Sequence, residues 1–95
     1  MAIESGFFTQ VDSNITGRKY HTLKTESAFY KEIEAGRKTF ELRVNDRDFQ
    51  VGDIVILKEV FDGIETGRAL PKKEIKYILF GGQFGLPETH CILQL

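Results

Sequence analysis

The segment from Gly36 to Asp53, GRKTFELRVNDRDFQVGD, places eight charged side chains in eighteen positions. Lys38 and Arg43 could bind a phosphate or a polarised carbonyl, because both side chains donate charge-assisted hydrogen bonds. Glu41 lies between them in the sequence and could pair with either cation or exchange a proton with a substrate. The segment is therefore the first candidate for a site. Its alternative is a solvated strand and turn with a surface ion pair worth about 0–1 kcal/mol.

The alternation of TFELRV, residues 39–44, indicates that a β-strand positions these side chains. Alternate residues of a strand point to opposite faces of the sheet. We expect the apolar set to face the core, namely Phe40, Leu42 and Val44. The other set then shares the opposite face, namely Thr39, Glu41 and Arg43. On that face Glu41 and Arg43 could pair directly or hold one ligand between them.

The neighbouring elements follow from the same patterns. Residues 20–25 are expected to form a strand, and Ser27–Ala35 a helix. On the apolar side of this helix, Phe29 and Ile33 are four positions apart with Tyr30 beside them. Thr25 or Ser27 can cap the start of this helix, and Gly36 suits its end. Three further strands are predicted, over residues 51–60, 72–80 and 90–95. In the second of these, one face is expected to carry Ile75, Tyr77 and Leu79.

These elements predict an α+β chain that is mostly β. About five strands and one early helix favour a small, mostly antiparallel barrel or strongly curved sheet. We expect one domain over residues 19–95, because ninety-five residues suffice for a single small domain. Residues 1–18 are expected to be a loose N-terminal arm, or to add a strand if the pair Phe7–Phe8 docks on the domain.

Composition excludes several classes of protein. The net charge is −1, although residues 18–47 carry eight Lys or Arg against five Asp or Glu. A strongly basic protein is therefore excluded, and a local basic patch is not. Cys91 is the only cysteine, so no intrachain disulfide can form. With no apolar run of about 20 residues and no signal-peptide pattern, the sequence predicts a cytoplasmic protein without membrane contact.

Other residues offer weaker candidates. Lys24 and Lys38 flank the predicted helix and could converge on one phosphate. His21 could act as an acid or base, or could have a structural role in the core. Asn45 with Asp46 and Asp48 lacks the loop length and ligands of a calcium site, so no metal or cofactor is expected. Three aromatic residues could stack on a base or belong to the core, namely Tyr77, Phe80 and Phe84.

Residues 36–43, GRKTFELR, fit the pattern G-x-K-x-x-E-x-R of ASCH (activating signal cointegrator homology) domains, which have a PUA-like barrel fold. Over residues 20–95 the chain resembles a small ASCH-like family of unassigned function in bacteria and phages. The resemblance implies a cleft for RNA or a modified nucleotide, lined by Lys38, Glu41 and Arg43. Spacing and charge lead us to add three residues to this nucleic-acid-binding set: Lys24, Asn45 and Arg47.

Two alternatives to binding alone stay open. One ASCH branch hydrolyses the acetyl amide of N4-acetylcytidine with a threonine three residues after the motif lysine, and Glu41 occupies that position here. If the domain is a hydrolase, Lys38 and Glu41 would instead form a general acid-base pair for RNA cleavage. The second alternative is a protein-interaction module without a small ligand. The sequence does not decide whether catalysis occurs, nor the oligomeric state.

Overall fold

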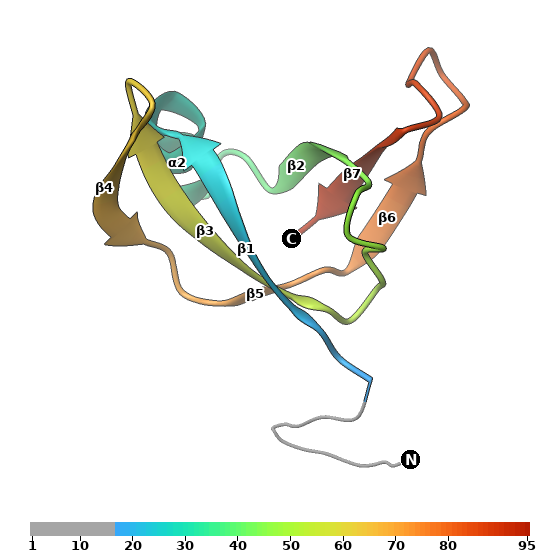
Figure 1. The fold of residues 1–95 in the computed structure, drawn as a ribbon, viewed down its shortest axis with the longest axis horizontal. Coiled ribbons are helices and arrows are strands. Elements are labelled where there is room, and N and C mark those ends of the chain that lie inside the picture. The colour runs from blue at the N-terminus through green and yellow to red at the C-terminus, as the bar shows by residue number, and fades with distance from the viewer. Residues whose placement is uncertain (1–16) are drawn as a thin grey trace.

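The computed structural model describes residues 17–95, and there the chain forms seven strands and one short helix (Figure 1). One sheet contains β1 (Tyr20–Glu26), β3 (Ile54–Phe61), β4 (Ile64–Ala69) and β5 (Lys73–Glu74). The other has the order β2 (Phe40–Val44), β7 (His90–Gln94) and β6 (Tyr77–Phe80). The helix, α2 (Ser27–Glu34), follows β1 directly. The predicted arm over residues 1–18 lies outside the described residues, apart from Gly17 and Arg18.

The mostly β class with one early helix is confirmed, whereas the closed barrel is not. β1 runs parallel to β3, in register from Tyr20 opposite Ile54 to Glu26 opposite Val60. All other strand pairs are antiparallel. No strand pair within residues 17–95 joins the two sheets. The sheets are instead connected by the chain itself and by side chains that reach between them.

The strand prediction needs two corrections. β4 was not predicted because its sequence, IETGRA, is polar and all six residues are exposed. Residues 72–80 form two short strands rather than one. The backbone N–H of Ile75 bonds to Asp53, beside β3, while that of Lys76 bonds to Gln94 of β7. The chain therefore passes from one sheet to the other here. Ile75 is buried and Tyr77 is exposed, so they do not share a core-facing side.

The helix has the predicted position, and two of the three side chains predicted for its apolar side are buried. Tyr30 and Ile33 are buried, whereas Phe29 is 54% exposed. No side chain caps its start, so the predicted cap by Thr25 or Ser27 is wrong. The Ser27 hydroxyl donates to Glu59 on β3 instead. Gly36 ends the helix as predicted, with a φ of 81° that suits glycine.

The hydrophobic core contains side chains from both sheets and from α2. Its largest fully buried members include Tyr30, Phe49, Leu23, Leu57, Ile75 and Leu93. Cys91 is also completely buried, and burial raises the pKa of its thiol.

A buried polar pair ties β1 to the loop before β3. His21 Nε2 lies 2.8 Å from Asp53 Oδ2, and the imidazole ring packs edge-on against Phe49 with ring centroids 4.7 Å apart. The Asp53 carboxylate also accepts hydrogen bonds from the backbone N–H groups of Lys19 and Gln50. Asp53 can be buried because each of its oxygens has partners. His21 therefore has the structural role that was one of its two interpretations.

The loop between β6 and β7 depends on a close backbone approach at Gly81. Its N–H donates to the carbonyl of His90. A Cβ atom added at Gly81 would lie 1.8 Å from the Pro87 carbonyl oxygen and 2.6 Å from that of His90. Only glycine fits this position without a backbone shift.

We expect Gly81→Ala to lower the free energy of unfolding by about 3 kcal/mol, because backbone atoms must move to admit the methyl group. Urea denaturation followed by circular dichroism measures this loss. Gly85→Ala is the matched control, since its φ is 77° and a Cβ there meets nothing within 4 Å. The control should lose only about 1 kcal/mol, from backbone strain. Equal losses in the two variants would contradict the steric explanation.

Candidate functional site

The charged face of β2 points into the molecule, and its apolar face points to solvent. Glu41 is 5% exposed, whereas Phe40, Leu42 and Val44 are 48%, 54% and 49% exposed. The strand was predicted correctly, but its two faces were assigned the wrong way round. The reason is that the carboxylate of Glu41 is neutralised and hydrogen-bonded inside the protein, which removes most of the penalty for burying it.

Lys38 and Arg43 provide that neutralisation. Lys38 Nζ donates to Glu41 Oε2 at 2.8 Å, and Arg43 donates to Glu41 Oε1 from Nε at 3.1 Å and from Nη2 at 3.0 Å. The two cations approach different oxygens, so the carboxylate is held on both sides. The three residues that fit the ASCH pattern thus form one contiguous cluster with a net charge of +1.

Two arginines also satisfy the open edge of β1. Arg43 Nη2 donates to the backbone carbonyl of Lys24 at 2.6 Å and to the hydroxyl of Thr25 at 3.2 Å. Arg47 Nη1 donates to the carbonyl of Thr22 at 2.8 Å. β1 pairs only with β3, so these carbonyls lie on an edge that no strand covers within residues 17–95. Arg43 and Arg47 therefore have structural roles, in addition to any ligand contact.

A pocket of about 350 Å³ opens beside this cluster. Its lining combines three apolar side chains with two charged ones: Phe29, Phe40, Leu42, Lys38 and Glu41. The Lys38 ammonium lies between two aromatic rings, 5.6 Å from the centroid of Phe29 and 4.7 Å from that of Phe40. The pocket is thus mostly apolar, with one polar side where hydrogen-bonding groups converge.

The polar side can still bind a ligand. Lys38 Nζ donates to Glu41 and to the carbonyl of Phe40, so one of its three protons stays available among the contacts of residues 17–95. The Lys38 side chain is 17% exposed, and solvent can reach it. An apolar slot with few convergent polar groups is the usual form of a small-ligand site.

The remaining predicted site residues lie elsewhere. The Lys24 side chain points to the opposite face of β1 from Thr25 and lies 3.7 Å from Glu65. Lys24 and Lys38 therefore do not converge. Asn45 Oδ1 accepts the backbone N–H of Phe49 and stabilises a turn. Of the six predicted residues, the structure brings Lys38, Glu41 and Arg43 together, and only the first two line the pocket.

Sequence reasoning missed the walls of the pocket. Phe29 was assigned to the buried side of the helix, and Phe40 and Leu42 to the core. One signal was available: Tyr30 and Ile33 are three positions apart, which is equally suited to a buried helix side. A helix that buries Tyr30 and Ile33 leaves Phe29 on the surface, where the structure places it beside Lys38.

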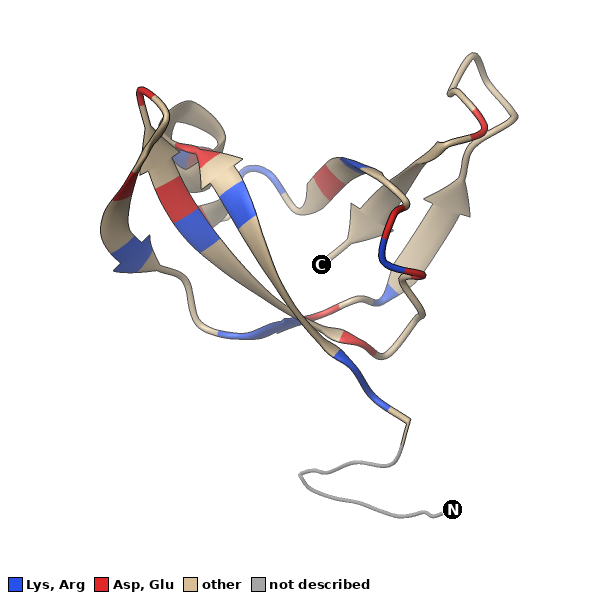
Figure 2. Ribbon diagram, in the orientation of Figure 1, with Lys and Arg blue, Asp and Glu red and all other residues tan. Residues whose placement is uncertain are grey.

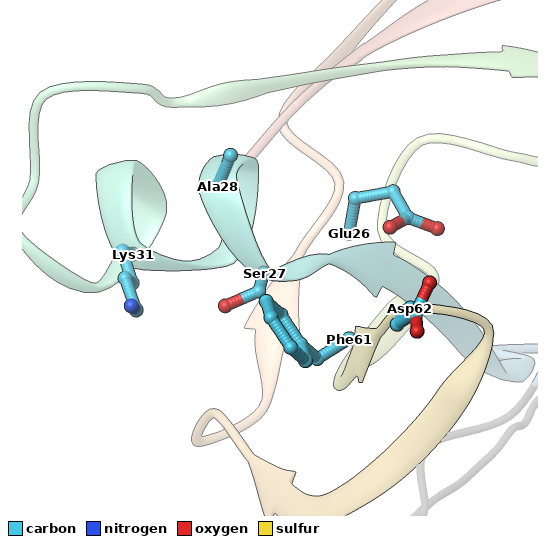
Figure 3. Close-up of a pocket in the computed structure, with 6 residues that line it drawn as sticks. All are labelled: Glu26, Ser27, Ala28, Lys31, Phe61 and Asp62. Carbon is cyan, nitrogen blue, oxygen red and sulfur yellow. The ribbon is translucent and has the colours of Figure 1, made fainter.

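A second pocket, of about 440 Å³, lies at the start of α2. In Figure 3 Phe61 lies next to Ser27, with Lys31 on one side and Glu26 and Asp62 on the other. Among the contacts of residues 17–95, no ion pair joins Lys31 to Glu26 or Asp62, so these charges do not form a connected cluster like the one at Glu41. The second pocket is a weaker candidate for a ligand site than the pocket beside Lys38.

Behind this second pocket, Glu59 joins α2 and β4 to β3. Its carboxylate accepts hydrogen bonds from Thr66 at 2.7 Å and from Ser27 at 2.8 Å. These two hydroxyls, followed by the positive charge of Arg68, hold the pKa of Glu59 below its ordinary value of 4.5. Arg68 Nη2 in turn donates to both carboxylate oxygens of Glu34.

Within residues 17–95, no three His, Cys, Asp or Glu side chains gather closely enough to hold a metal ion. In the same range, no helix has the length and apolar character to cross a membrane.

A family model described as a domain of unknown function, DUF3850, matches residues 20–95. The chain belongs to this DUF3850 family. A relative, the uncharacterized 12.9 kDa protein in the GpA 3′ region of Escherichia phage P2, is 36% identical over 50 residues. The match covers 53% of this chain and 46% of that relative, so the chain spans just under half of the relative's length. The DUF3850 match assigns no function, and the ASCH resemblance stays a prediction.

We expect Glu41→Ala to lower the free energy of unfolding by about 3 kcal/mol, because it leaves Lys38 and Arg43 partly buried without their shared partner. Thermal or urea denaturation of the purified chain measures the change. Glu32→Ala is the control, since Glu32 pairs with Arg37 on the exposed surface and its removal should change stability little. A loss as small as that of the control would contradict a buried, shared carboxylate.

The contribution of Glu59 should depend on pH. A carboxyl whose pKa is lower in the folded protein stabilises it above the ordinary pKa, and this contribution is lost as pH falls through the folded-state value. Glu59→Gln and Thr66→Val should therefore both flatten the fall in unfolding free energy below about pH 4.5. Urea denaturation at several pH values between neutral and acidic measures the slope. An unchanged slope in Glu59→Gln would show that Glu59 is not held in its ionised form.

Proposed function

We propose that this DUF3850 domain binds RNA through a single nucleobase or modified nucleotide, held in the pocket beside Lys38. One observation carries the proposal: two aromatic rings and Leu42 form the walls of a 350 Å³ pocket whose polar side is the Lys38–Glu41 pair. A flat base can stack on an exposed ring, and its edge can hydrogen-bond to an ammonium or a carboxylate.

The electrostatics support a small ligand rather than a long strand. Many phosphate contacts give strong, salt-dependent affinity, and a chain with a net charge of −1 is poorly suited to form them. The cluster contributes a local charge of only +1. A short single strand or one nucleotide therefore suits the pocket better than a duplex. The ASCH resemblance, including its PUA-like fold, supports the same class of ligand.

Hydrolysis is less well supported. A general base must be free to accept a proton, whereas Glu41 is 5% exposed and already accepts hydrogen bonds from Lys38 and Arg43. Thr39 and Glu41 do not reproduce the nucleophile position of the acetylcytidine amidohydrolases. A cytoplasmic location belongs to the proposal, since the only cysteine is unpaired and RNA is present there.

The proposal is tested with short fluorescein-labelled single-stranded RNAs of mixed sequence, titrated with protein and followed by fluorescence anisotropy. Phe29→Ser should weaken binding about tenfold or more, because it removes a stacking ring. Lys38→Ala should weaken binding and reduce its dependence on salt.

Phe61→Ser is the matched control, because Phe61 is also an exposed aromatic, at 66%, but lies in the other pocket. Circular dichroism establishes that each variant is folded. Binding that is equal in the native chain, Phe29→Ser and Phe61→Ser would remove the pocket from consideration, as would a native chain that binds none of the RNAs.

A further inference from the structure

Three exposed residues form a row across the sheet of β2, β7 and β6. Gln94 of β7 is the register partner of Phe40 on β2 and of Tyr77 on β6, and residues directly opposite each other point to the same side of a sheet. Phe40 and Tyr77 are 48% and 60% exposed, and Gln94 between them is exposed too. We call Phe40, Gln94 and Tyr77 the aromatic row.

The aromatic row begins at the pocket beside Lys38, because Phe40 is a wall of that pocket. Neighbouring strands lie about 4.8 Å apart, so the row carries its second ring roughly 10 Å from the first. Stacked nucleotides follow one another at about 3.4 Å along a strand. A base in the pocket and a base stacked on Tyr77 can therefore belong to one short strand.

A lysine stands at the far end of the aromatic row. Lys76 directly precedes Tyr77, is exposed, and donates its backbone N–H to the carbonyl of Gln94 at 2.8 Å. Among the salt bridges of residues 17–95, none involves the Lys76 ammonium. Its charge is therefore available for a phosphate beside the row.

Further cations make this end of the row a basic patch. Lys72 and Lys73 precede Lys76 in the same connection, and the Arg18 guanidinium lies 3.9 Å from the carboxylate of Glu74. These four cations and one carboxylate have a net charge of +3. Figure 2 shows the imbalance in the chain through β5, where blue positions lie on both sides of a single red one. The patch can bind a few phosphates of one strand, whereas the adjoining row can bind bases.

The length of the ligand follows from this arrangement. Tyr77 and Lys76 do not line the pocket beside Lys38, so a nucleotide held in that pocket does not use them. A strand of several nucleotides uses the pocket, the second ring and the basic patch together. Phe40 and Leu42 keep their place as walls of the pocket in such a complex.

We propose that the ligand is a single-stranded RNA of several nucleotides rather than a free nucleotide, with a second base stacked on Tyr77 and a phosphate bound by Lys76. This inference rests on the proposed function, because it continues the strand whose first base is held beside Lys38. It adds a second subsite at the opposite edge of the sheet and assigns the basic patch to the RNA backbone.

Ligand length tests the second subsite. A fluorescein-labelled RNA of about six nucleotides, a length typical of single-strand binding sites, is titrated with protein and followed by fluorescence anisotropy. It is then displaced by the unlabelled RNA or by unlabelled nucleoside monophosphates. The native chain should bind the strand about tenfold or more tightly than any monophosphate. Equal affinities for the two lengths would overturn the proposal.

Tyr77→Ser should weaken binding of the strand about fivefold or more, because one base loses its stacking partner. The same variant should bind the monophosphates as the native chain does. Tyr77→Phe is the matched variant, since it keeps the ring, and should bind the strand normally. An unchanged affinity for the strand in Tyr77→Ser, or an equal loss with both ligand lengths, would overturn the role of Tyr77.

Lys76→Ala should weaken binding of the strand and reduce the slope of log affinity against log salt by roughly 0.7, the value for one phosphate contact on a single strand. Lys31→Ala is the matched control, because it removes the same charge from an exposed lysine at the second pocket. The control should keep the native slope. Equal changes in the two variants would show an effect of net charge alone and would overturn the contact at Lys76.

Phe29→Ser separates this inference from the proposed function, and circular dichroism establishes that every variant is folded. If Phe29→Ser weakens binding of the strand while Tyr77→Ser and Lys76→Ala do not, the pocket stands and the second subsite is overturned. If the native chain does not bind the strand, the proposed function fails and the second subsite fails with it.

Discussion

The buried carboxylate of Glu41 is the interaction on which the rest of the arrangement depends. A carboxylate that is 5% exposed requires cations, and Lys38 and Arg43 provide them from both sides. This requirement determines which face of β2 turns inward. It places Lys38 between the rings of Phe29 and Phe40, and it sends three apolar side chains of β2 outward. The pocket and the exposed apolar side of β2 thus have one physical cause.

The same cluster explains how two separate sheets stay together without a shared strand pair. Arg43 contacts Glu41 of one sheet and the backbone edge of the other, through the carbonyl of Lys24. Arg47 makes a similar contact with Thr22. These arginines provide donors for an edge strand that could otherwise pair with another chain. The charged side chains in this region therefore stabilise the fold, and a ligand can bind only to the hydrogen-bond donors that these contacts leave free.

Much of the fold could be predicted from the sequence, because strand alternation, a glycine helix end and turn residues are local signals. The faces of β2 could not be predicted, since apolar alternation shows that two faces differ but not which one finds a partner. The face that turns inward depends on contacts outside the strand. Lys38 bonds to Glu41, and Thr25 of β1, eighteen positions before Arg43, bonds to Arg43. β4 was missed for a related reason: its polar, exposed residues form a strand only because β3 provides the edge. In the site, the motif pattern indicated Lys38, Glu41 and Arg43, whereas the aromatic walls required knowledge of which helix side is buried.

The position of β7 at the centre of its sheet has a consequence for how the protein is made. Leu42 of β2 pairs with Ile92, fifty positions later in the chain, and β6 also joins the sheet only through β7. A ribosome adds about 5–20 residues per second, so β2 waits roughly 3–10 s for its partner. Before β7 is made, β2 lacks the strand with which it pairs in the folded protein. The three-stranded sheet therefore forms only after residues 90–94 have been added, late in the folding of this domain.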